Sequence, residues 1–104
     1  MGSPRRYAIE LTREADEHLA ALATPERKRV LDSLERRLGH EPTVETRNRK
    51  RLRPNPVAPW ELRIGHLRVY FDVEDEPRLV VRILAVGVKV RNRVRIGGDE
   101  VELR

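Results

Sequence analysis

Arginine and lysine side chains gather on two hydrophobic segments in the second half of this chain. The first segment, WELRIGHLRVYFD at residues 60–72, alternates apolar and polar residues on both sides of a Gly-His pair. The second, VGVKVRNRV at 86–94, places cations directly after a nearly continuous apolar run. Cations that converge in a concave place bind phosphodiesters and stabilise the charge that develops on phosphorus during strand cleavage.

The first segment is predicted to form a β-hairpin whose polar face carries cations. Gly65-His66 is a turn signal between two alternating runs. The alternation places Arg63 and Arg68 on the face opposite the apolar residues, and Tyr70 shares that face. We therefore expect two guanidinium groups and one aromatic ring on the same side of the hairpin.

Two further groups of cations are expected near this face. Lys89 and Arg91 follow the apolar run at 78–87, which predicts a central strand. A basic run at 47–53 comes before the hairpin and is expected to line the same side. Residues 47–95 contain thirteen Lys or Arg against five Asp or Glu, a local excess of about +8. A field of this sign attracts polyanions, above all nucleic acid phosphates, and equally an acidic protein partner.

Composition limits the remaining classes of protein. The length of 104 residues fits one compact domain over 1–104, and 38% hydrophobic residues supply one core. No apolar run is long enough to span a bilayer, and the first residues lack the apolar region of a signal peptide. The absence of cysteine excludes a disulfide framework. No spacing of His, Asp or Glu indicates a metal site, so we expect no metal and no cofactor. The lack of a membrane-spanning run, a signal peptide and cysteine leads us to expect a cytoplasmic protein.

The elements that must position these cations begin with a strand and two helices. Residues 7–11 alternate as a short strand with one buried face. Thr12 is a predicted N-cap for a helix that follows it, and Thr24 is a predicted N-cap for a second helix with Pro25 at its first position. Gly39 is the expected stop of the second helix.

The rest of the chain predicts irregular structure and then strands. Residues 40–59 hold four prolines and show no period, which predicts a loop with Leu52 anchored in the core. Strands are expected at 60–64, 67–73 and 78–87, and Gly97-Gly98 is expected to turn a last hairpin between 94–96 and 101–103. The predicted fold is therefore α+β: an antiparallel β-meander with an N-terminal strand and a helical hairpin packed on one face.

The chain resembles the RelE/ParE superfamily of toxins from type II toxin–antitoxin systems. The resemblance covers almost the whole chain and rests on three stretches. They are the K-R-L-R stretch at 50–53, the W-E-L-R-I-G-H-L-R-V-Y-F hairpin at 60–71 and the A-V-G at 85–87 with cations after it. RelE-like members cleave mRNA in the ribosomal A site, whereas ParE-like members poison DNA gyrase.

The RelE-like resemblance implies a metal-independent ribonuclease that inhibits translation. The 2′-hydroxyl of the RNA attacks the adjacent phosphate and leaves a 2′,3′-cyclic phosphate and a 5′-hydroxyl. By residue type and position, the matching catalytic residues are Arg63, Arg68, Lys89 and Arg91. The implied RNA-binding residues are Lys50, Arg51, Arg53, Tyr70 and Arg95.

One departure from the RelE-like pattern concerns the proton acceptor. Many RelE-like members carry a tyrosine several residues past A-V-G, and the position that corresponds here is Arg95. Arginine cannot act as a base, because it does not deprotonate in proteins. The expected base is therefore His66, a lysine with a lowered pKa or a group of the ribosomal RNA.

The resemblance also implies partners and leaves alternatives open. A cognate antitoxin with a partly disordered, amphipathic segment is expected to wrap the domain, and the ribosome and mRNA are the expected targets. The toxin–antitoxin complex is also expected to bind operator DNA, and no membrane is involved. The alternatives are a ParE-like gyrase inhibitor without nuclease activity, and a non-toxic nucleic-acid- or antitoxin-binding module on the same fold.

Overall fold

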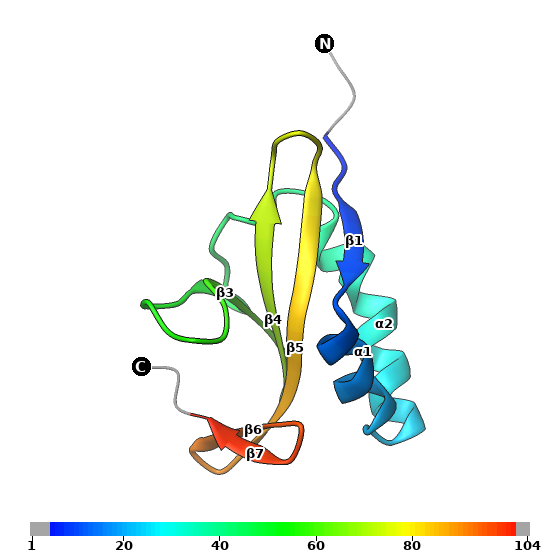
Figure 1. Cartoon of the computed structure of the whole chain (residues 1–104), viewed down its shortest axis with the longest axis vertical. Helices are drawn as coiled ribbons and strands as arrows, with labels where there is room; N and C mark the ends of the chain where they lie inside the picture. Colours follow the sequence, from blue (N-terminus) through cyan, green and yellow to red (C-terminus); the bar gives the residue numbers. More distant parts are fainter. Residues whose placement is uncertain (1–4, 102–104) are drawn as a thin grey trace.

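Strands of one sheet form the centre of the molecule, and two helices pack on one face of it (Figure 1). The computed structural model describes residues 5–101. The helices are α1 (Arg13–Ala20) and α2 (Thr24–Leu38). The strands are β1 (Ala8–Leu11), β2 (Arg49–Arg51), β3 (Trp60–Ile64), β4 (Leu67–Glu74), β5 (Val80–Val90), β6 (Arg93–Ile96) and β7 (Asp99–Val101). The predicted α+β architecture is confirmed.

The long strand β5 organises the sheet. Strands β2 to β7 follow one another in sequence order, and each neighbouring pair is antiparallel. The first half of β5 also pairs in parallel with β1, whereas its last residues pair with β6. The β4–β5 turn and the β6–β7 hairpin therefore lie at opposite ends of the molecule (Figure 1). Both faces of β5 are covered, since Val81, Ile83 and Val86 belong to one core cluster and Leu84 and Ala85 to the other, and this explains its nearly continuous apolar sequence.

The two helices begin and end close to the expected positions. Thr12 caps α1 as predicted, since its hydroxyl accepts a 3.1 Å hydrogen bond from the backbone N–H of Ala15. The predicted cap of α2 is wrong by one residue. Ala23 is the N-cap and Thr24 is already helical, because the Ala23 carbonyl accepts the bond from the N–H of Arg27. Gly39 ends α2 as expected. Neither helix within residues 5–101 has the length and apolarity needed to cross a bilayer.

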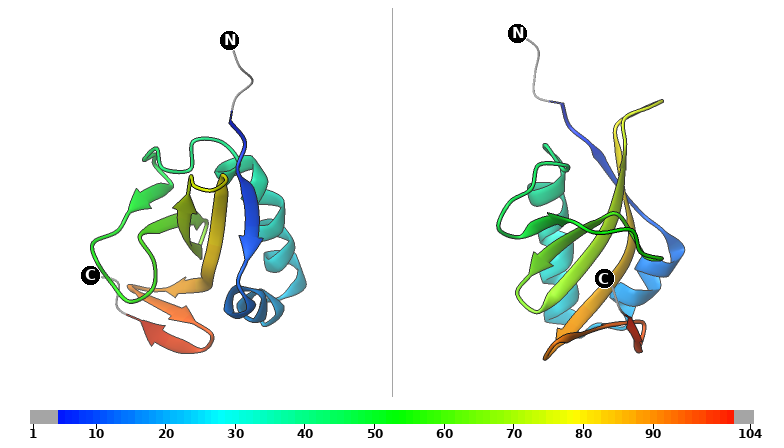
Figure 2. Two further views of the ribbon diagram at one scale, coloured as in Figure 1. Left: turned by 45° about the horizontal axis from the view of Figure 1, so that its top comes forward. Right: turned by 90° about the vertical axis from the view of Figure 1, so that its left-hand side faces the viewer.

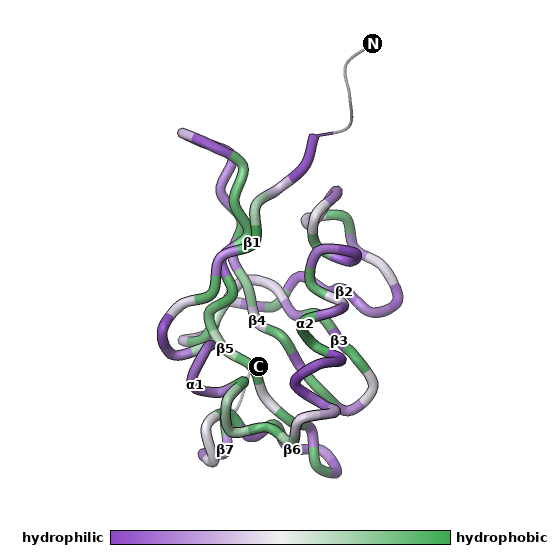
Figure 3. Tube along the Cα trace, turned by 90° about the vertical axis from the view of Figure 1, so that its right-hand side faces the viewer, coloured by the Kyte–Doolittle hydropathy of each residue, from purple (hydrophilic) through white to green (hydrophobic). Residues whose placement is uncertain are grey.

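The main core lies between the helices and one face of the sheet. Apolar side chains from both helices and from β3, β4 and β5 form a single buried cluster. Trp60 is 5% exposed and its ring stacks on Phe71 with the centroids 6.1 Å apart, as expected for a core residue. Hydrophobic residues follow β4 and β5 through the middle of the chain trace (Figure 3). Burial of these aliphatic and aromatic groups is the main stabilising term of the fold.

The opposite face of the sheet is also covered, by the segment 52–59 and the β6–β7 hairpin (Figure 2). Tyr70, Ala58 and Ala85 are buried there, and Leu52 packs against them. The prediction of an unpaired loop over 40–59 is wrong at 49–51, because these residues form β2 and pair with β3. A three-residue strand shows too little alternation for sequence periodicity to detect it.

Strand β5 is longer than predicted, because it continues past Gly87 to Val90. Lys89 therefore lies within the strand, and Arg91 occupies the β5–β6 turn with a φ of 58°. Strand β7 ends at Val101, and residues 102–103 of the expected last strand lie outside the described residues. The turn between β6 and β7 is at Gly97-Gly98, as predicted, and both glycines have positive φ.

Candidate functional site

A cleft of about 670 Å³ opens on the sheet face away from the helices. Five strands, β3 to β7, and the β5–β6 turn contribute to its walls, and we call it the cationic cleft. Its lining consists of Leu52, Glu61, Arg63, Arg68, Lys89, Asn92, Arg93, Val94, Glu100 and Val101. Three of the four predicted catalytic residues, which are Arg63, Arg68 and Lys89, therefore come together in one place.

Arg63 and Arg68 face each other across the hairpin. Their Cα positions are paired in the β3–β4 register, and Arg68 is also paired with Gly87 of β5. The Arg68 side chain donates bonds of 2.7 Å and 2.9 Å to the carbonyls of Gly65 and Leu67, and the residue is only 8% exposed. Arginine has five N–H donors, so this fixed guanidinium keeps donors for a phosphate in the cleft.

Glu61 is a cleft residue that the sequence reasoning missed. Its carboxylate accepts a 2.9 Å bond from Nε of Arg63 and a 3.0 Å bond from the hydroxyl of Tyr70. The residue is 5% exposed, so it offsets part of the positive charge in a place with little water. Alternation could have identified it. Glu61 is two residues before Arg63 in the same strand, so both side chains lie on the face opposite the apolar residues.

Tyr70 serves the structure of the cleft and has no surface for RNA. It lies on the same face as the cations, as predicted, but its exposed fraction is 0%. Burial and the neighbouring carboxylate of Glu61 hold the pKa of Tyr70 far above its ordinary value. Segment 52–59 and the β6–β7 hairpin cover the ring, so the RNA contact expected of Tyr70 has no exposed surface in this structure.

The cations after A-V-G do not all face the cleft. Lys89 is exposed, lines the cleft and has no ion-pair partner among residues 5–101. Arg91 and Arg95 are exposed but are not among the lining residues. Arg93, which the sequence reasoning did not select, does line the cleft and pairs with Glu100 across the β6–β7 hairpin. Residues 91 and 92 form the turn that joins the antiparallel strands β5 and β6. Beyond this turn Arg93 lines the cleft, whereas Arg95 does not.

The basic run before the hairpin also lies outside the cleft. Lys50 and Arg51 are exposed on β2, and the Arg51 guanidinium lies 5.5 Å from the centroid of the Trp60 ring. Arg51 and Arg53 border a separate hollow of about 390 Å³ over segment 51–59. Lys50 is paired with Glu61 in the β2–β3 register and so lies on the cleft side of the sheet, but none of these three cations is among the residues that line the cleft.

His66 is engaged by a helix residue. Its Nε2 atom lies 2.6 Å from Oε2 of Glu26 in the first turn of α2, and His66 is not among the residues that line the cleft. A base must reach the proton that it removes, so this position gives no support to His66 as the proton acceptor. Two carboxylates, Glu61 and Glu100, line the cleft, and Glu61 is the one that contacts Arg63.

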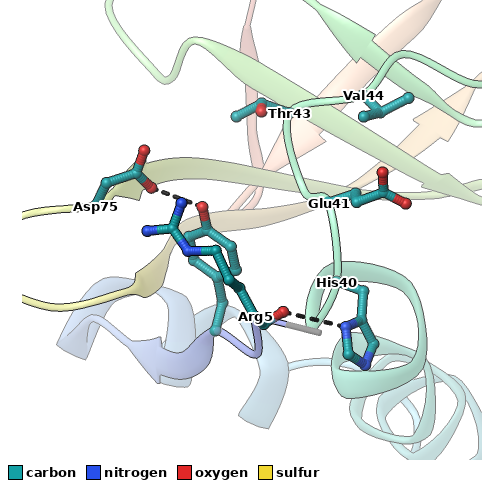
Figure 4. Close-up of a pocket in the computed structure, with 7 residues that line it drawn as sticks. Arg5, His40, Glu41, Thr43, Val44 and Asp75 are labelled. Carbon is teal, nitrogen blue, oxygen red and sulfur yellow. Dashed lines mark hydrogen bonds between the residues drawn. The ribbon is translucent and has the colours of Figure 1, made fainter. Parts of the chain in front are cut away.

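A larger hollow, of about 750 Å³, lies where the start of β1 meets the end of α2 and the β4–β5 turn (Figure 4). The Tyr7 hydroxyl donates a 2.6 Å bond to Asp75 there, and Nδ1 of His40 lies 3.1 Å from the Arg5 carbonyl. This hollow contains none of the cations predicted for phosphate chemistry. No group of three or more His, Asp or Glu side chains in residues 5–101 is arranged to hold a metal ion.

Comparison with known proteins places this geometry in a known fold. No protein-family model and no curated protein matches the chain. Among solved structures, the chain is similar to one in the crystal structure of the toxin–antitoxin complex RelBE2 from Mycobacterium tuberculosis. The TM-score is 0.71, the identity is 25%, and the match covers 86% of this chain and 98% of that chain. The chain therefore has the RelE-like toxin fold, as its hairpin and its A-V-G run predicted.

Proposed function

We propose that this chain is the toxin of a type II toxin–antitoxin system and that its cationic cleft promotes cleavage of mRNA on the ribosome. The fold likeness to a toxin–antitoxin complex supports the toxin role and an antitoxin partner. The observation that carries the nuclease role is the convergence of Arg63, Arg68 and Lys89 from three strands on one cleft. The site of action is then the cytoplasm, with the ribosome and mRNA as partners and operator DNA as a partner of the antitoxin-bound form.

The proposed reaction uses the nucleophile of the RNA itself. The 2′-oxygen forms a bond to phosphorus as its proton leaves, and the bond from phosphorus to the 5′-oxygen breaks. The products are a 2′,3′-cyclic phosphate and a 5′-hydroxyl, which takes its proton from water or Lys89. Arg68 and Lys89 stabilise the phosphoryl oxygens, whose charge increases in the transition state. These steps need no metal and no other cofactor.

Glu61 replaces His66 as the proton acceptor in this proposal. Each carboxylate oxygen has two lone pairs, so Glu61 keeps acceptor capacity beside its bonds to Arg63 and Tyr70. Its position in the cleft brings a base and the phosphate-binding cations together. Arg63 then has two roles, since it orients this carboxylate and adds positive charge next to the phosphate.

The ParE-like alternative keeps a specific observation in its favour. Arg95 stands where RelE-like members carry a tyrosine, and it lies outside the cleft lining. A gyrase inhibitor needs no proton acceptor, so the lack of a tyrosine at this position would not impair its activity. A non-toxic binding module on the same fold would likewise keep the cations without cutting RNA.

Induced expression in a bacterium separates the three functions. We would follow incorporation of labelled methionine and labelled thymidine in cells that express the wild type or Lys89→Gln. Early loss of methionine incorporation, relieved by the substitution, is the result expected for mRNA cleavage. Early loss of thymidine incorporation supports gyrase as the target, and growth without loss of either label contradicts both toxin activities.

A further inference from the structure

A second hollow lined by cations lies on the other face of the sheet from the cationic cleft. It has a volume of about 520 Å³ and lies between the end of α2 and β2. Arg36 and Arg37 reach it from α2, Arg47 from the segment before β2, and Arg49 from β2 itself. We call it the arginine pocket. Its other lining residues are His40, Thr46, Asn48 and Leu62.

The charges of this pocket are not neutralised by the ion pairs of the described residues. None of the salt bridges within residues 5–101 involves Arg36, Arg37 or Arg47. The side-chain bond of Arg36 goes to the hydroxyl of Ser33, at 3.4 Å. Like charges that the backbone holds together repel one another, and a bound anion removes that repulsion. The pocket is therefore suited to an anionic ligand.

Arg49 holds together the two segments that form the walls of the pocket. It is 9% exposed, and its guanidinium donates to the carbonyls of Val44 and Arg37, the first over 2.7 Å. These bonds tie the segment before β2 to the last turn of α2. A planar guanidinium has several N–H donors in fixed directions, so it can bond to both carbonyls at once. Because Arg49 holds these two segments together, the positions of the other three arginines depend on Arg49.

Phosphate is the anion that fits this lining. Guanidinium groups bind phosphate oxygens in bidentate fashion, and the amide, hydroxyl and imidazole of the remaining residues are further hydrogen-bonding groups. A protein partner would need an apolar or aromatic anchor at the centre of the contact. The one aliphatic side chain in the lining, Leu62, is 1% exposed and offers no such anchor. The lining thus favours a nucleic acid backbone over an acidic peptide.

The two cation sites lie on opposite faces of the same strand. Leu62 of β3 borders the arginine pocket, whereas its neighbours Glu61 and Arg63 border the cationic cleft. Strand β2 forms the end of the sheet between them, and its exposed Lys50 is paired with Glu61. A strand of nucleic acid that leaves the cleft over β2 would pass Lys50 and then reach the arginine pocket.

We infer that the arginine pocket is a second phosphate-binding site, which holds the backbone of the RNA whose scissile phosphate lies in the cleft. The choice of RNA rests on the proposed function, whereas the phosphate chemistry rests on the pocket alone. The pocket adds affinity without sequence preference, because it contacts phosphates and carries no group placed to read bases. Cleavage by a protein without the pocket would still occur, but only at higher RNA or ribosome concentration.

The test measures binding of a fluorescently labelled single-stranded RNA by anisotropy, over a range of salt concentrations. The pocket variant is Arg36→Gln/Arg47→Gln, which leaves Arg49 in place. The matched control is Lys28→Gln/Arg29→Gln, which removes the same charge from exposed positions near the start of the same helix. The pocket variant should bind about tenfold more weakly at low salt, and its salt slope should fall by about 1.4, the value for two lost phosphate contacts.

Three results would overturn the inference. Equal weakening by both variants would mean that only the overall positive field matters, and unchanged binding by the pocket variant would mean that the pocket takes no phosphate. Equal competition by polyglutamate and by unlabelled RNA would assign the pocket to an acidic protein. Because anisotropy reports binding, a wild type that binds RNA through the pocket but leaves ribosome-bound mRNA intact would refute the nuclease proposal and not this one.

Discussion

The hydroxyl of Tyr70 donates a 3.0 Å hydrogen bond to Oε2 of Glu61, and both residues are almost completely removed from water. The second carboxylate oxygen of Glu61 accepts from Arg63. A buried tyrosine therefore fixes the carboxylate that sits among the cations of the cleft. This contact connects the cluster under segment 52–59 to the chemistry proposed for the site.

Removing the Tyr70 hydroxyl should destabilise the protein. In Tyr70→Phe the buried oxygen of Glu61 loses its donor, and the expected loss in the free energy of unfolding is about 2 kcal/mol. Urea denaturation followed by circular dichroism measures it. Tyr7→Phe is the control, because the Tyr7 hydroxyl also donates to a carboxylate, that of Asp75, but in an exposed place. That change should cost less than about 0.5 kcal/mol; equal losses for the two variants would contradict the prediction.

The same contact predicts a loss of stability at alkaline pH. Burial and Glu61 raise the pKa of Tyr70 in the folded protein above its ordinary value of 10.0. The folded state then keeps the proton while the unfolded state releases it, so the stabilisation is complete below pH 10.0 and declines as the pH rises above it. Urea midpoints of the wild type and Tyr70→Phe should converge above that pH. Parallel curves would show that Tyr70 titrates normally.

Substitution of Lys89 should lower activity alone, whereas substitution of Arg68 should lower both activity and stability. Lys89 is exposed, so Lys89→Gln should change the free energy of unfolding by less than about 0.5 kcal/mol and slow mRNA cleavage about a hundredfold. Arg68→Ala should lower both activity and stability, because it also removes the bonds to Gly65 and Leu67. Primer extension on mRNA from a translation reaction, with a thermal melt of each variant, measures both effects. If Lys89→Gln cleaves mRNA at the wild-type rate, the cleft does not take part in the reaction.

Arg49 should be structural although it belongs to a basic run. Arg49→Gln removes the donors to the carbonyls of Arg37 and Val44 and should lower the free energy of unfolding by about 2 to 3 kcal/mol. Its neighbour Arg47 is exposed, and Arg47→Gln should leave stability unchanged. Urea denaturation of both variants checks the contrast. A stable Arg49→Gln would mean that the two carbonyls find water instead.

Gly87 is required by the close approach of β6. A Cβ atom at this position would lie 2.7 Å from the Arg95 carbonyl oxygen and 2.9 Å from Cγ1 of Ile96. Gly87→Ala should therefore push the β6–β7 hairpin away and cost about 1 to 3 kcal/mol of stability. Val90→Ala, at an exposed site of the same strand, is the control. Hydrogen exchange should be faster in β6 for the glycine variant only; unchanged exchange there would contradict the close approach.

Much of the fold followed from local patterns. Alternation in the hairpin predicted that its apolar residues and Arg63 lie on opposite faces, and the structure confirms this. Caps, turn glycines and the apolar run of β5 located most of the remaining elements. These features depend on residues close together in sequence, so the sequence alone carries them.

The candidate site depended on contacts that no local pattern contains. Alternation assigns a residue to a face, but exposure depends on what packs over that face, and segment 52–59 covers Tyr70. The bond from His66 to Glu26 joins residues forty positions apart. Arg49 belongs to a basic run in the sequence, but in the fold its guanidinium donates to the carbonyl of Arg37 at the end of α2 and to that of Val44. The sequence by itself determined the order of the elements apart from β2, and the side of the hairpin that carries Arg63 and Arg68. Only the tertiary structure decided which of the cations converge, because convergence depends on segments that pair and pack across the sheet.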